Sequence, residues 1–249
     1  MKKILLISNS FGVDATRYFY GVCRKAKEDV MTVCLYISGC SLERHYKNML
    51  SEEKAYQLYF NGAPSPFHLS LKDALLSDDW DIITLQQVSN LSGDFSTYEP
   101  YLSELSDYVK KLVPKAKQYI HSIWAWRDEE IIKHALPYKN TTEMSEYSRR
   151  AYQLAAEKIN ADGLIPATVA MSELQSRIGD AAYRDGLHAS EGIGRFMLAL
   201  LWYGYIFKKD IEGIGFNDFD VDITDEEIKI AEECAKKALA ENTYIKNNE

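Results

Sequence analysis

Short apolar runs alternate along the chain with longer stretches in which apolar residues recur every three or four positions. The runs are rich in β-branched residues, which predicts buried strands. They cover residues 3–7, 30–37, 81–85, 118–123 and 164–165. The stretches between them predict helices at residues 16–27, 101–113, 145–160, 167–178, 192–207 and 224–241. This alternation predicts a parallel sheet with helices on both faces.

Residues 50–71 and 89–98 follow neither pattern. Both segments are polar or carry Pro and Gly, so we expect loops there. The last predicted helix opens with Thr224-x-x-Glu227, a pattern in which the two side chains cap the helix reciprocally. At 249 residues the chain is expected to form a single domain, residues 1–249, with the helix at 224–241 packed on it.

The bulk composition is that of a globular protein. Apolar residues make up 46% of the chain and charged residues 27%. The 29 Lys and Arg residues against 37 Asp and Glu give a net charge of −8, which disfavours a nucleic-acid partner because phosphate binding needs a basic face. The apolar run before Ser8 is too short for a signal peptide or a membrane span. We therefore expect a cytoplasmic protein with no membrane partner, or a secreted or periplasmic one if a leader has been removed.

Cysteine and histidine spacing favours neither a disulfide framework nor a metal site. The cysteines form no CxxC pair, and we expect free thiols. They are Cys23, Cys34, Cys40 and Cys234. His68, His121 and His134 lack the spacing of metal ligands, so no metal is expected.

A serine near the N-terminus and an aspartate and a histidine near the C-terminus form the strongest chemical pattern. Ser10 follows the first predicted strand, so its hydroxyl is expected at the carboxyl end of that strand, where open α/β sheets bind ligands. Asp185 and His188 are spaced to meet locally. If their segment lies at the same edge of the sheet, His188 can deprotonate Ser10 while Asp185 orients the imidazole. The pattern predicts a hydrolase or an acyl transferase.

Each of these residues also has an ordinary structural interpretation. A serine after a strand is commonly a helix N-cap, an Asp-Gly pair usually marks a turn, and a lone histidine is more often a packing residue. The occurrence of all three together favours the catalytic interpretation. Cys40 and His45 offer a rival nucleophile pair, but no third residue is patterned to orient it.

Four segments resemble the SGNH hydrolases, also called GDSL esterases. They are Ser8-Asn9-Ser10-Phe11, Ser38-Gly39-Cys40-Ser41-Leu42-Glu43, Leu85-Gln86-Gln87-Val88-Ser89 and Asp185-Gly186-Leu187-His188. They look like a branch of that superfamily common in gut bacteria, and the likeness spans about residues 3–207. The resemblance implies a three-layer α/β/α sandwich built on a five-stranded parallel, flavodoxin-like sheet.

The resemblance also implies a role for each matching residue. Ser10 corresponds to the nucleophile, His188 to the general base and Asp185 to the orienting carboxylate. The oxyanion hole of the family combines the amide of the nucleophile, a glycine amide after the second strand and an asparagine side chain after the third. These donors correspond to Ser10, Gly39 and Asn90.

Two segments depart from the family pattern. The Gly-Asp that usually precedes the nucleophile is Ser8-Asn9, and the usual Gly-x-Asn is Val88-Ser89-Asn90. Gln86 lies nearer the end of the third strand than Asn90 and carries an equally good amide donor. Asn90 and Gln86 are therefore competing candidates for the third oxyanion donor.

Trp124 and Trp126 follow the fourth predicted strand, at the edge expected to hold the active site. Two indoles there can stack on a sugar ring, although large aromatic residues usually pack beneath a loop. His45 is expected to line the same crevice. We therefore predict substrate contacts for His45, Trp124 and Trp126.

These patterns predict a serine esterase of SGNH type that cleaves a small acyl ester, with O-acetyl groups on a carbohydrate as the expected substrate. The reaction needs no cofactor, and the expected partner is the small-molecule or carbohydrate ester itself. The alternative is a non-catalytic binding module on the same fold. A phosphate binder is disfavoured because residues 8–12 are too poor in glycine for a phosphate loop. An exposed Ser10 hydroxyl facing His188 would favour the enzyme over the binding module.

Overall fold

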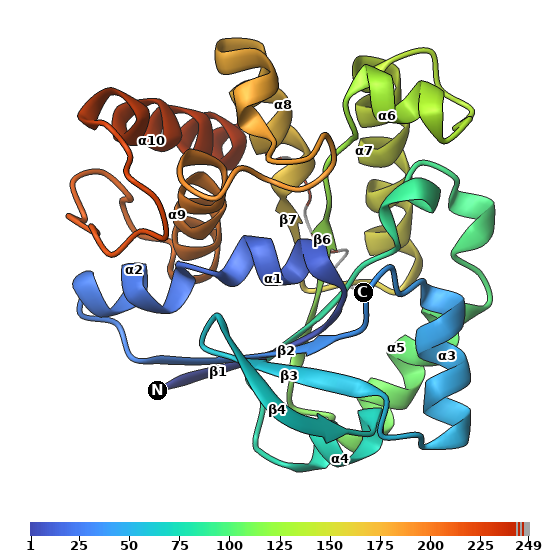
Figure 1. The fold of residues 1–249 in the computed structure, drawn as a ribbon. Helices are drawn as coiled ribbons and strands as arrows, with labels where there is room; N and C mark the ends of the chain where they lie inside the picture. The colour runs from blue at the N-terminus through green and yellow to red at the C-terminus, as the bar shows by residue number, and fades with distance from the viewer. Residues whose placement is uncertain (243, 245, 247–249) are drawn as a thin grey trace.

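A computed structural model describes residues 1–242, 244 and 246, which fold around one central sheet (Figure 1). The order of its strands is β4-β3-β2-β1-β5-β6-β7. The strands are β1 (Lys2–Ser8), β2 (Val30–Tyr36), β3 (Tyr56–Phe60), β4 (Ala63–Leu69), β5 (Ile82–Leu85), β6 (Lys117–Ser122) and β7 (Gly163–Pro166). Five of them, β2, β1, β5, β6 and β7, run parallel, which confirms the predicted α/β architecture.

The sheet of the described residues has seven strands rather than the expected five, because residues 50–71 contain a β-hairpin instead of a loop. β3 pairs antiparallel with β2, and β4 pairs antiparallel with β3. Pro64 and Pro66 are tolerated in β4 because it is the edge strand and one side of its backbone needs no partner. β4 is mostly exposed and lacks the alternation of apolar and polar residues that reveals a strand in a sequence.

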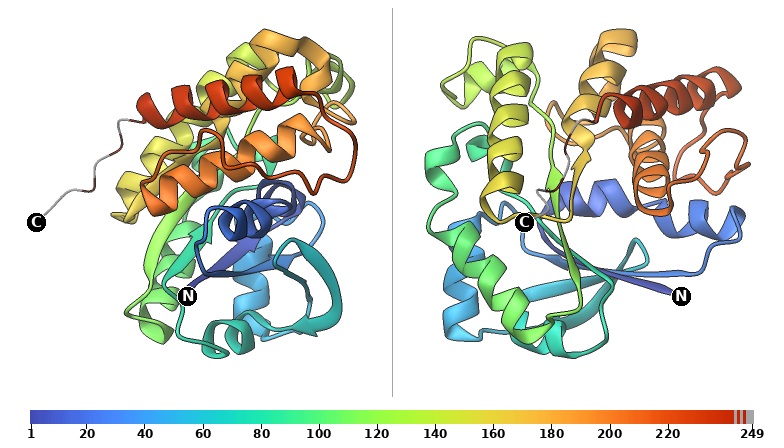
Figure 2. Two further views of the ribbon diagram at one scale, coloured as in Figure 1. Left: turned by 90° about the vertical axis from the view of Figure 1, so that its left-hand side faces the viewer. Right: turned by 180° about the vertical axis from the view of Figure 1, so that it is seen from behind.

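Helices cover both faces of the sheet, as expected (Figures 1 and 2). One face carries α1 (Ser10–Thr16), α2 (Phe19–Lys25) and α9 (Ile193–Phe207), and the other carries α3 (Leu42–Ser51), α5 (Tyr101–Leu112) and α7 (Thr141–Lys158). α8 (Ala167–Ile178) follows β7, and α10 (Asp225–Ala240) packs against α8 and α9. The short elements are α4 (Leu71–Leu76), α6 (Asp128–Lys133) and the 3₁₀ turns η1 (Ser89–Leu91), η2 (Phe95–Thr97) and η3 (Gly179–Ala182). None of the helices in the described part of the chain is long and apolar enough to cross a membrane.

The first helix begins at Ser10, earlier than the helix predicted at residues 16–27, and this region forms two short helices. Asn9 is the N-cap of α1, because its Oδ1 accepts a hydrogen bond from the Phe11 amide at 3.1 Å. Gly12 lets α1 approach β1, since a Cβ at this position would lie 2.0 Å from Ser8 Oγ. Ser10 therefore lies on the first turn of a helix that packs closely against the strand before it.

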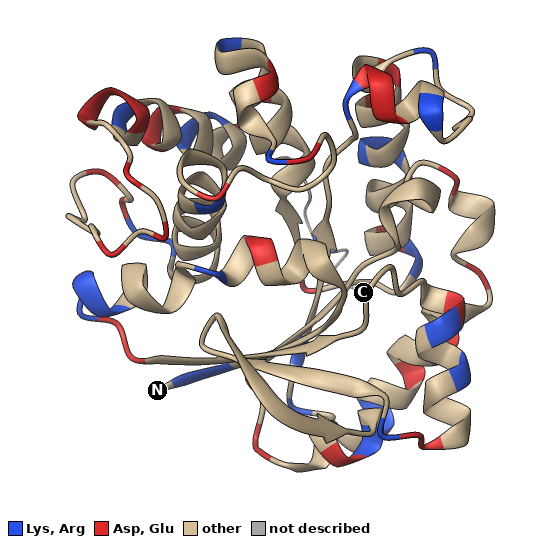
Figure 3. Cartoon of the chain, in the orientation of Figure 1, with Lys and Arg blue, Asp and Glu red and all other residues tan. Residues whose placement is uncertain are grey.

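Two smaller sequence predictions are confirmed. The capping box of α10 is present, because Thr224 Oγ1 accepts from the Glu227 amide at 3.2 Å while Glu227 Oε2 accepts from the Thr224 amide at 2.7 Å. All four cysteines are buried and free. Figure 3 shows acidic residues at the start of α10, where their negative charges stabilise the helix by interacting with the positive end of its dipole.

Candidate active site

The serine, histidine and aspartate singled out in the sequence lie within hydrogen-bond distance of one another. His188 Nε2 lies 2.8 Å from Ser10 Oγ, and His188 Nδ1 lies 2.7 Å from Asp185 Oδ2. Ser10 is partly exposed, and the side chains of His188 and Asp185 are 20% and 47% exposed. A histidine held in this way can accept the serine proton while the carboxylate fixes the orientation of its ring.

The second carboxylate oxygen of Asp185 holds the backbone of the same loop. Asp185 Oδ1 accepts hydrogen bonds from the amides of His188 at 2.8 Å and Leu187 at 3.2 Å. Partial burial raises the pKa of Asp185, but the hydrogen bonds donated by the amide and ring of His188 and the amide of Leu187 outweigh burial, and the pKa falls below its usual value. An ionised Asp185 favours the tautomer of His188 with its proton on Nδ1, which leaves Nε2 free to accept the proton of Ser10.

Residues 182–190 form a short hairpin, which we call the histidine hairpin, with a bridge between Tyr183 and Ala189 at its base. Its tip turns at Gly186, where φ is +85°, a conformation that favours glycine. The Gly186 carbonyl accepts from the Arg127 amide at 2.8 Å, and the Leu187 carbonyl accepts from Trp124 Nε1 at 2.8 Å. The segment after β6 thus holds the hairpin over the carboxyl end of the sheet.

Gly39 and Asn90 flank the turn that carries Ser10, because they follow the two strands that neighbour β1. β1 pairs with β2 and with β5 in parallel register. Gly39 and Asn90 are exposed, and φ of Gly39 is +57°. Within the described part of the chain, no group accepts a hydrogen bond from the amides of Ser10 and Gly39 or from the Asn90 side chain. These groups are available as donors to a ligand.

Gln86 lies in the interior, which removes it from the competition with Asn90. It is 2% exposed, and its Nε2 donates to Asn9 Oδ1 at 2.9 Å. Its Oε1 lies 2.9 Å from Nδ1 of His121, a ring whose pKa burial lowers to about 3. Asn9 Nδ2 in turn donates to the Cys40 carbonyl at 3.1 Å. Gln86 therefore stabilises the Ser10 turn and the loop of Gly39 from below, instead of donating to a substrate.

The sequence patterns did not reveal this buried chain of Asn9, Gln86 and His121. The sequence contained one signal for it, the Asn9 that replaces the aspartate of the family pattern. An asparagine can donate and accept at the same time, whereas an ionised aspartate only accepts. Asn9 uses both capacities, because it caps α1 through its oxygen and holds the Cys40 carbonyl through its nitrogen.

The three residues predicted to contact substrate are buried, so that prediction is wrong. His45 is 0% exposed, and its Nδ1 lies 3.0 Å from the Tyr56 hydroxyl. Trp124 is 1% exposed and packs on Phe11 with ring centroids 4.6 Å apart. Trp126 is 8% exposed. The large apolar surfaces of the tryptophans stabilise the floor of the site, and they are not available to stack on a sugar ring.

The rival pair of Cys40 and His45 does exist as a contact, with Sγ and Nδ1 3.5 Å apart. Burial raises the pKa of the Cys40 thiol to about 12, although the charge of Arg44 lowers it. Burial likewise lowers the pKa of His45 to about 3, with a smaller contribution from Arg44. At neutral pH the thiol is protonated and buried, so the pair does not supply a nucleophile.

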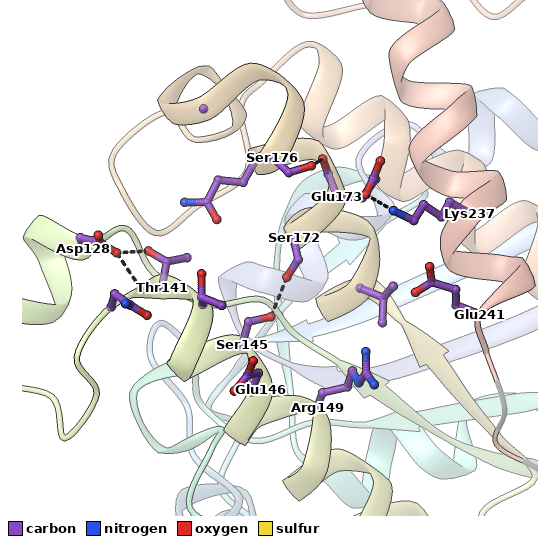
Figure 4. Close-up of a pocket in the computed structure, with 15 residues that line it drawn as sticks. Asp128, Thr141, Ser145, Glu146, Arg149, Ser172, Glu173, Ser176, Lys237 and Glu241 are labelled. Carbon is purple, nitrogen blue, oxygen red and sulfur yellow. Dashed lines mark hydrogen bonds and ion pairs between the residues drawn. The ribbon is translucent and has the colours of Figure 1, made fainter.

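A groove away from Ser10 lies between α7, α8 and α10 (Figure 4). It encloses about 570 Å³, and many of its polar groups already pair with one another. Ser145 and Ser172 hydroxyls lie 2.6 Å apart, and Lys237 Nζ donates to Glu173 Oε2 at 2.5 Å. Among the described residues, no cluster of three or more His, Cys, Asp or Glu side chains could hold a metal ion.

Solved structures with related architecture confirm the resemblance drawn from the sequence. The chain is similar to a DUF4886 family protein from Bacteroides uniformis ATCC 8492, with 26% identity, a TM-score of 0.88 and coverage of 96% of this chain and 95% of that chain. It is also similar to a putative GDSL-like lipase from Parabacteroides merdae ATCC 43184, with 16% identity, a TM-score of 0.56 and coverage of 84% and 96%. A family 3 carbohydrate esterase from Clostridium thermocellum shares 17% identity and a TM-score of 0.52 over 83% and 96%.

The last two identities are low, so these likenesses establish a common fold and not a common substrate. No curated protein sequence matches the chain. A family model described as a domain of unknown function, DUF4886, matches residues 3–238, which is nearly the whole chain. The chain therefore belongs to the DUF4886 family, and it shares its fold with the GDSL-like lipase and the carbohydrate esterase.

Proposed function

We propose that the protein is a serine ester hydrolase with Ser10 as nucleophile, His188 as general base and Asp185 as orienting carboxylate. The observation that carries the proposal is the pair of contacts, 2.8 Å and 2.7 Å long, that joins the three side chains. The ordinary role of a serine at this place, the helix N-cap, belongs to Asn9 instead. The Ser10 hydroxyl is therefore free for chemistry and already faces the base.

The reaction follows from the positions of the protons. His188 Nε2 takes the proton of Ser10 as Oγ attacks the ester carbonyl, and the resulting tetrahedral intermediate carries a negative oxygen. The protonated His188 then donates that proton to the alcohol as the bond to the leaving group breaks. Water attacks the acyl-enzyme by the same route, which releases the acid and restores Ser10.

The negative oxygen of the intermediate needs donors that point at it before the reaction begins. We assign this role to the amides of Ser10 and Gly39 and to the side chain of Asn90. The amide of Ser10 is at the first position of α1, where helical amides have no acceptor within the helix. The Gly39 amide and the Asn90 side chain are supported as donors because both residues are exposed and neither group has another acceptor within the described residues.

For the substrate we propose a small acyl ester, with O-acetyl groups on a carbohydrate as the first class to test. A carbohydrate is chosen for the first test because a family 3 carbohydrate esterase has this fold. The buried Trp124 and Trp126 add nothing to this choice. A small acyl group is the simplest one to test because Ser10 is only partly exposed.

The test is hydrolysis of acetylated xylose and of aryl acetate and aryl octanoate esters by the wild-type protein, with Ser10→Ala and Ser41→Ala as matched variants. Ser41 lies at the same sheet edge and caps α3. We expect wild type and Ser41→Ala to cleave acetyl esters in preference to octanoyl esters, and Ser10→Ala to cleave neither. Equal rates for Ser10→Ala and wild type would refute the proposed nucleophile. Preference for octanoate would refute the small acyl group.

A further inference from the structure

Asp14 is a buried carboxylate on the same face of α1 as Ser10, one helical turn further along the chain. Its side chain is only 1% exposed. Arg184 Nη1 donates to its Oδ1 at 2.8 Å and to its Oδ2 at 2.9 Å, and Arg195 Nε donates to Oδ1 at 3.0 Å. A buried charge is retained only when it is paired and hydrogen-bonded in this way. Asp14 thus joins α1 to two distant segments of the chain.

Arg184 belongs to the histidine hairpin and directly precedes Asp185. The same Nη1 that contacts Asp14 also donates to the Ala189 carbonyl at 2.8 Å, and the Arg184 amide donates to the His188 carbonyl at 3.1 Å. Arg184 therefore spans both strands of the hairpin on either side of Asp185 and His188. Through Asp14, this brace is fixed to the helix that carries Ser10.

Two polar connections consequently run in parallel between α1 and the histidine hairpin, beside the packing of the Phe11 ring on the His188 ring. One is the reactive contact between Ser10 Oγ and His188 Nε2, and the other is the ion pair between Asp14 and Arg184. A hydrogen bond that must break and re-form in each catalytic cycle cannot by itself keep α1 and the histidine hairpin at a fixed distance. The ion pair contains no group that transfers a proton, so it can maintain the spacing while the proton moves.

We propose that Asp14 is a positioning residue that sets the distance and orientation of His188 relative to Ser10. The inference rests on the proposed function.

The inference has a second part, which concerns the charge of Arg184. Paired with Asp14, the guanidinium of Arg184 is kept away from the neighbouring carboxylate of Asp185. Without Asp14, the partly exposed guanidinium of Arg184 would be free to turn to Asp185, the neighbouring anion in the chain, and to compete with His188 for its oxygens.

The network also provides a matched control. Asp220 pairs with Arg17, whose Nε donates to its Oδ2 at 2.8 Å, and with Arg195, whose Nη1 donates to the same oxygen at 3.1 Å. The carboxylate is 28% exposed and shares Arg195 with Asp14, yet none of its ion pairs involves Arg184. Asp220→Asn removes a charge from the same network without disturbing the brace to the histidine hairpin.

The experiment compares Asp14→Asn, Asp220→Asn and wild type by two measurements. The first is the ¹H and ¹⁵N shifts of the His188 imidazole, and the second is the rate constant for labelling of Ser10 by a fluorophosphonate. We expect Asp14→Asn to shift the imidazole resonances and to slow labelling about 10- to 100-fold, the loss typical of a small misplacement in an active site. Asp220→Asn should keep the wild-type resonances and a rate within about twofold of wild type.

Arg184→Met covers the case in which Asp14→Asn does not fold. It leaves Asp14 paired with Arg195, and it should also shift the imidazole resonances and slow labelling, in this case through loss of the brace alone. Wild-type resonances and rates in either variant would overturn the inference. If wild-type Ser10 is not labelled at all, the proposed function fails, and the His188 resonances still decide whether Asp14 positions the ring.

Discussion

Two histidine environments lie at the same edge of the sheet and differ in exposure and in hydrogen bonding. His188, on the histidine hairpin, is 20% exposed, and each of its ring nitrogens lies within 2.8 Å of a polar side chain. His45 and His121 are 0% exposed, and the Nε2 atom of each has no partner among the described residues. The difference shows that contact between a histidine and a polar group is not enough to define a catalytic site.

Proton transfer requires a ring that can take up charge. A partly exposed imidazole beside an ionised carboxylate can do so, whereas burial makes the charged form costly. Burial lowers the pKa of both His45 and His121 to about 3, and these rings stay neutral at physiological pH. The site is therefore divided into a reactive corner at Ser10, Asp185 and His188 and a neutral supporting layer beneath it.

The largest expected effect is that of His188→Ala, which removes the general base. We predict that kcat/KM for an acetyl ester falls by about 10⁶-fold, as it does when the triad histidine of a serine protease is removed. The fold should persist, because His188 is partly exposed and lies on a hairpin held by other contacts. Adding Ser10→Ala should cause no further loss, and a further multiplicative loss would argue against a single catalytic unit.

Asp185→Asn comes next, with a predicted loss of about 10⁴-fold in kcat, because an amide in place of the carboxylate favours the wrong tautomer of His188. The pKa of Asp185 lies below its usual value, so the carboxylate is present at every pH above about 5. The ratio of wild-type to Asp185→Asn rates, measured from pH 7 to pH 9, should therefore stay large. A ratio near one across that range would contradict the assignment.

The third prediction separates the oxyanion donor from the supporting layer. Asn90→Ala should lower kcat by about 10²- to 10³-fold without a change in the melting temperature, because Asn90 is exposed. Gln86→Ala should instead lower the melting temperature, because it removes a buried hydrogen bond to Asn9 and leaves Nδ1 of His121 unpaired. Kinetics and thermal unfolding of the two variants check the assignment, and reversed results would show that Gln86 is the donor.

The smallest effect concerns the buried histidines and the stability of the fold in acid. In the unfolded chain a histidine binds a proton below about pH 6.5, whereas folded His45 and His121 do so only near pH 3. The unfolded state then binds more protons between these values, so stability falls as the pH falls from 6.5 to 3. Each histidine contributes up to about 1.4 kcal/mol per pH unit.

Urea unfolding of wild type, His45→Gln and His121→Gln across this pH range measures that slope. Each substitution removes one of the two titrating rings, and each should flatten the dependence of the unfolding free energy on pH. Matching slopes in all three proteins would mean that the buried rings take up protons in the folded state. That result would remove the distinction between the neutral layer and the reactive corner.

The elements that the sequence predicted well are those with a strong pattern. Five buried strands and the long helices have clear periodicity, and the spacing of Asp185 and His188 indicated their contact. The hairpin at β3 and β4 was missed because an exposed edge strand with two prolines has no apolar alternation. The burial of His45, Trp124 and Trp126 was missed because position at a sheet edge does not say whether a side chain points into the crevice or into the core beneath it.

The pairing of Asp14 with Arg184 joins residues 170 positions apart. A local pattern cannot reveal such a pairing, because each partner alone is one charged residue among many. The sequence contained one indication, which is that Asp14 lies between the apolar positions of α1. A carboxylate buried there needs a cation or hydrogen-bond donors as its partner. Tertiary structure supplies the partner.

The most direct test of the reactive corner is the reaction of the purified protein with a fluorophosphonate, followed by mass mapping of the adduct, with Ser10→Ala and Ser41→Ala as controls. This measurement requires no knowledge of the natural ester. We expect one adduct, on Ser10, that is present in wild type and Ser41→Ala and lost in Ser10→Ala. A folded wild-type protein that forms no adduct, or one that carries it on another residue, would contradict the proposal that Ser10 is an activated nucleophile.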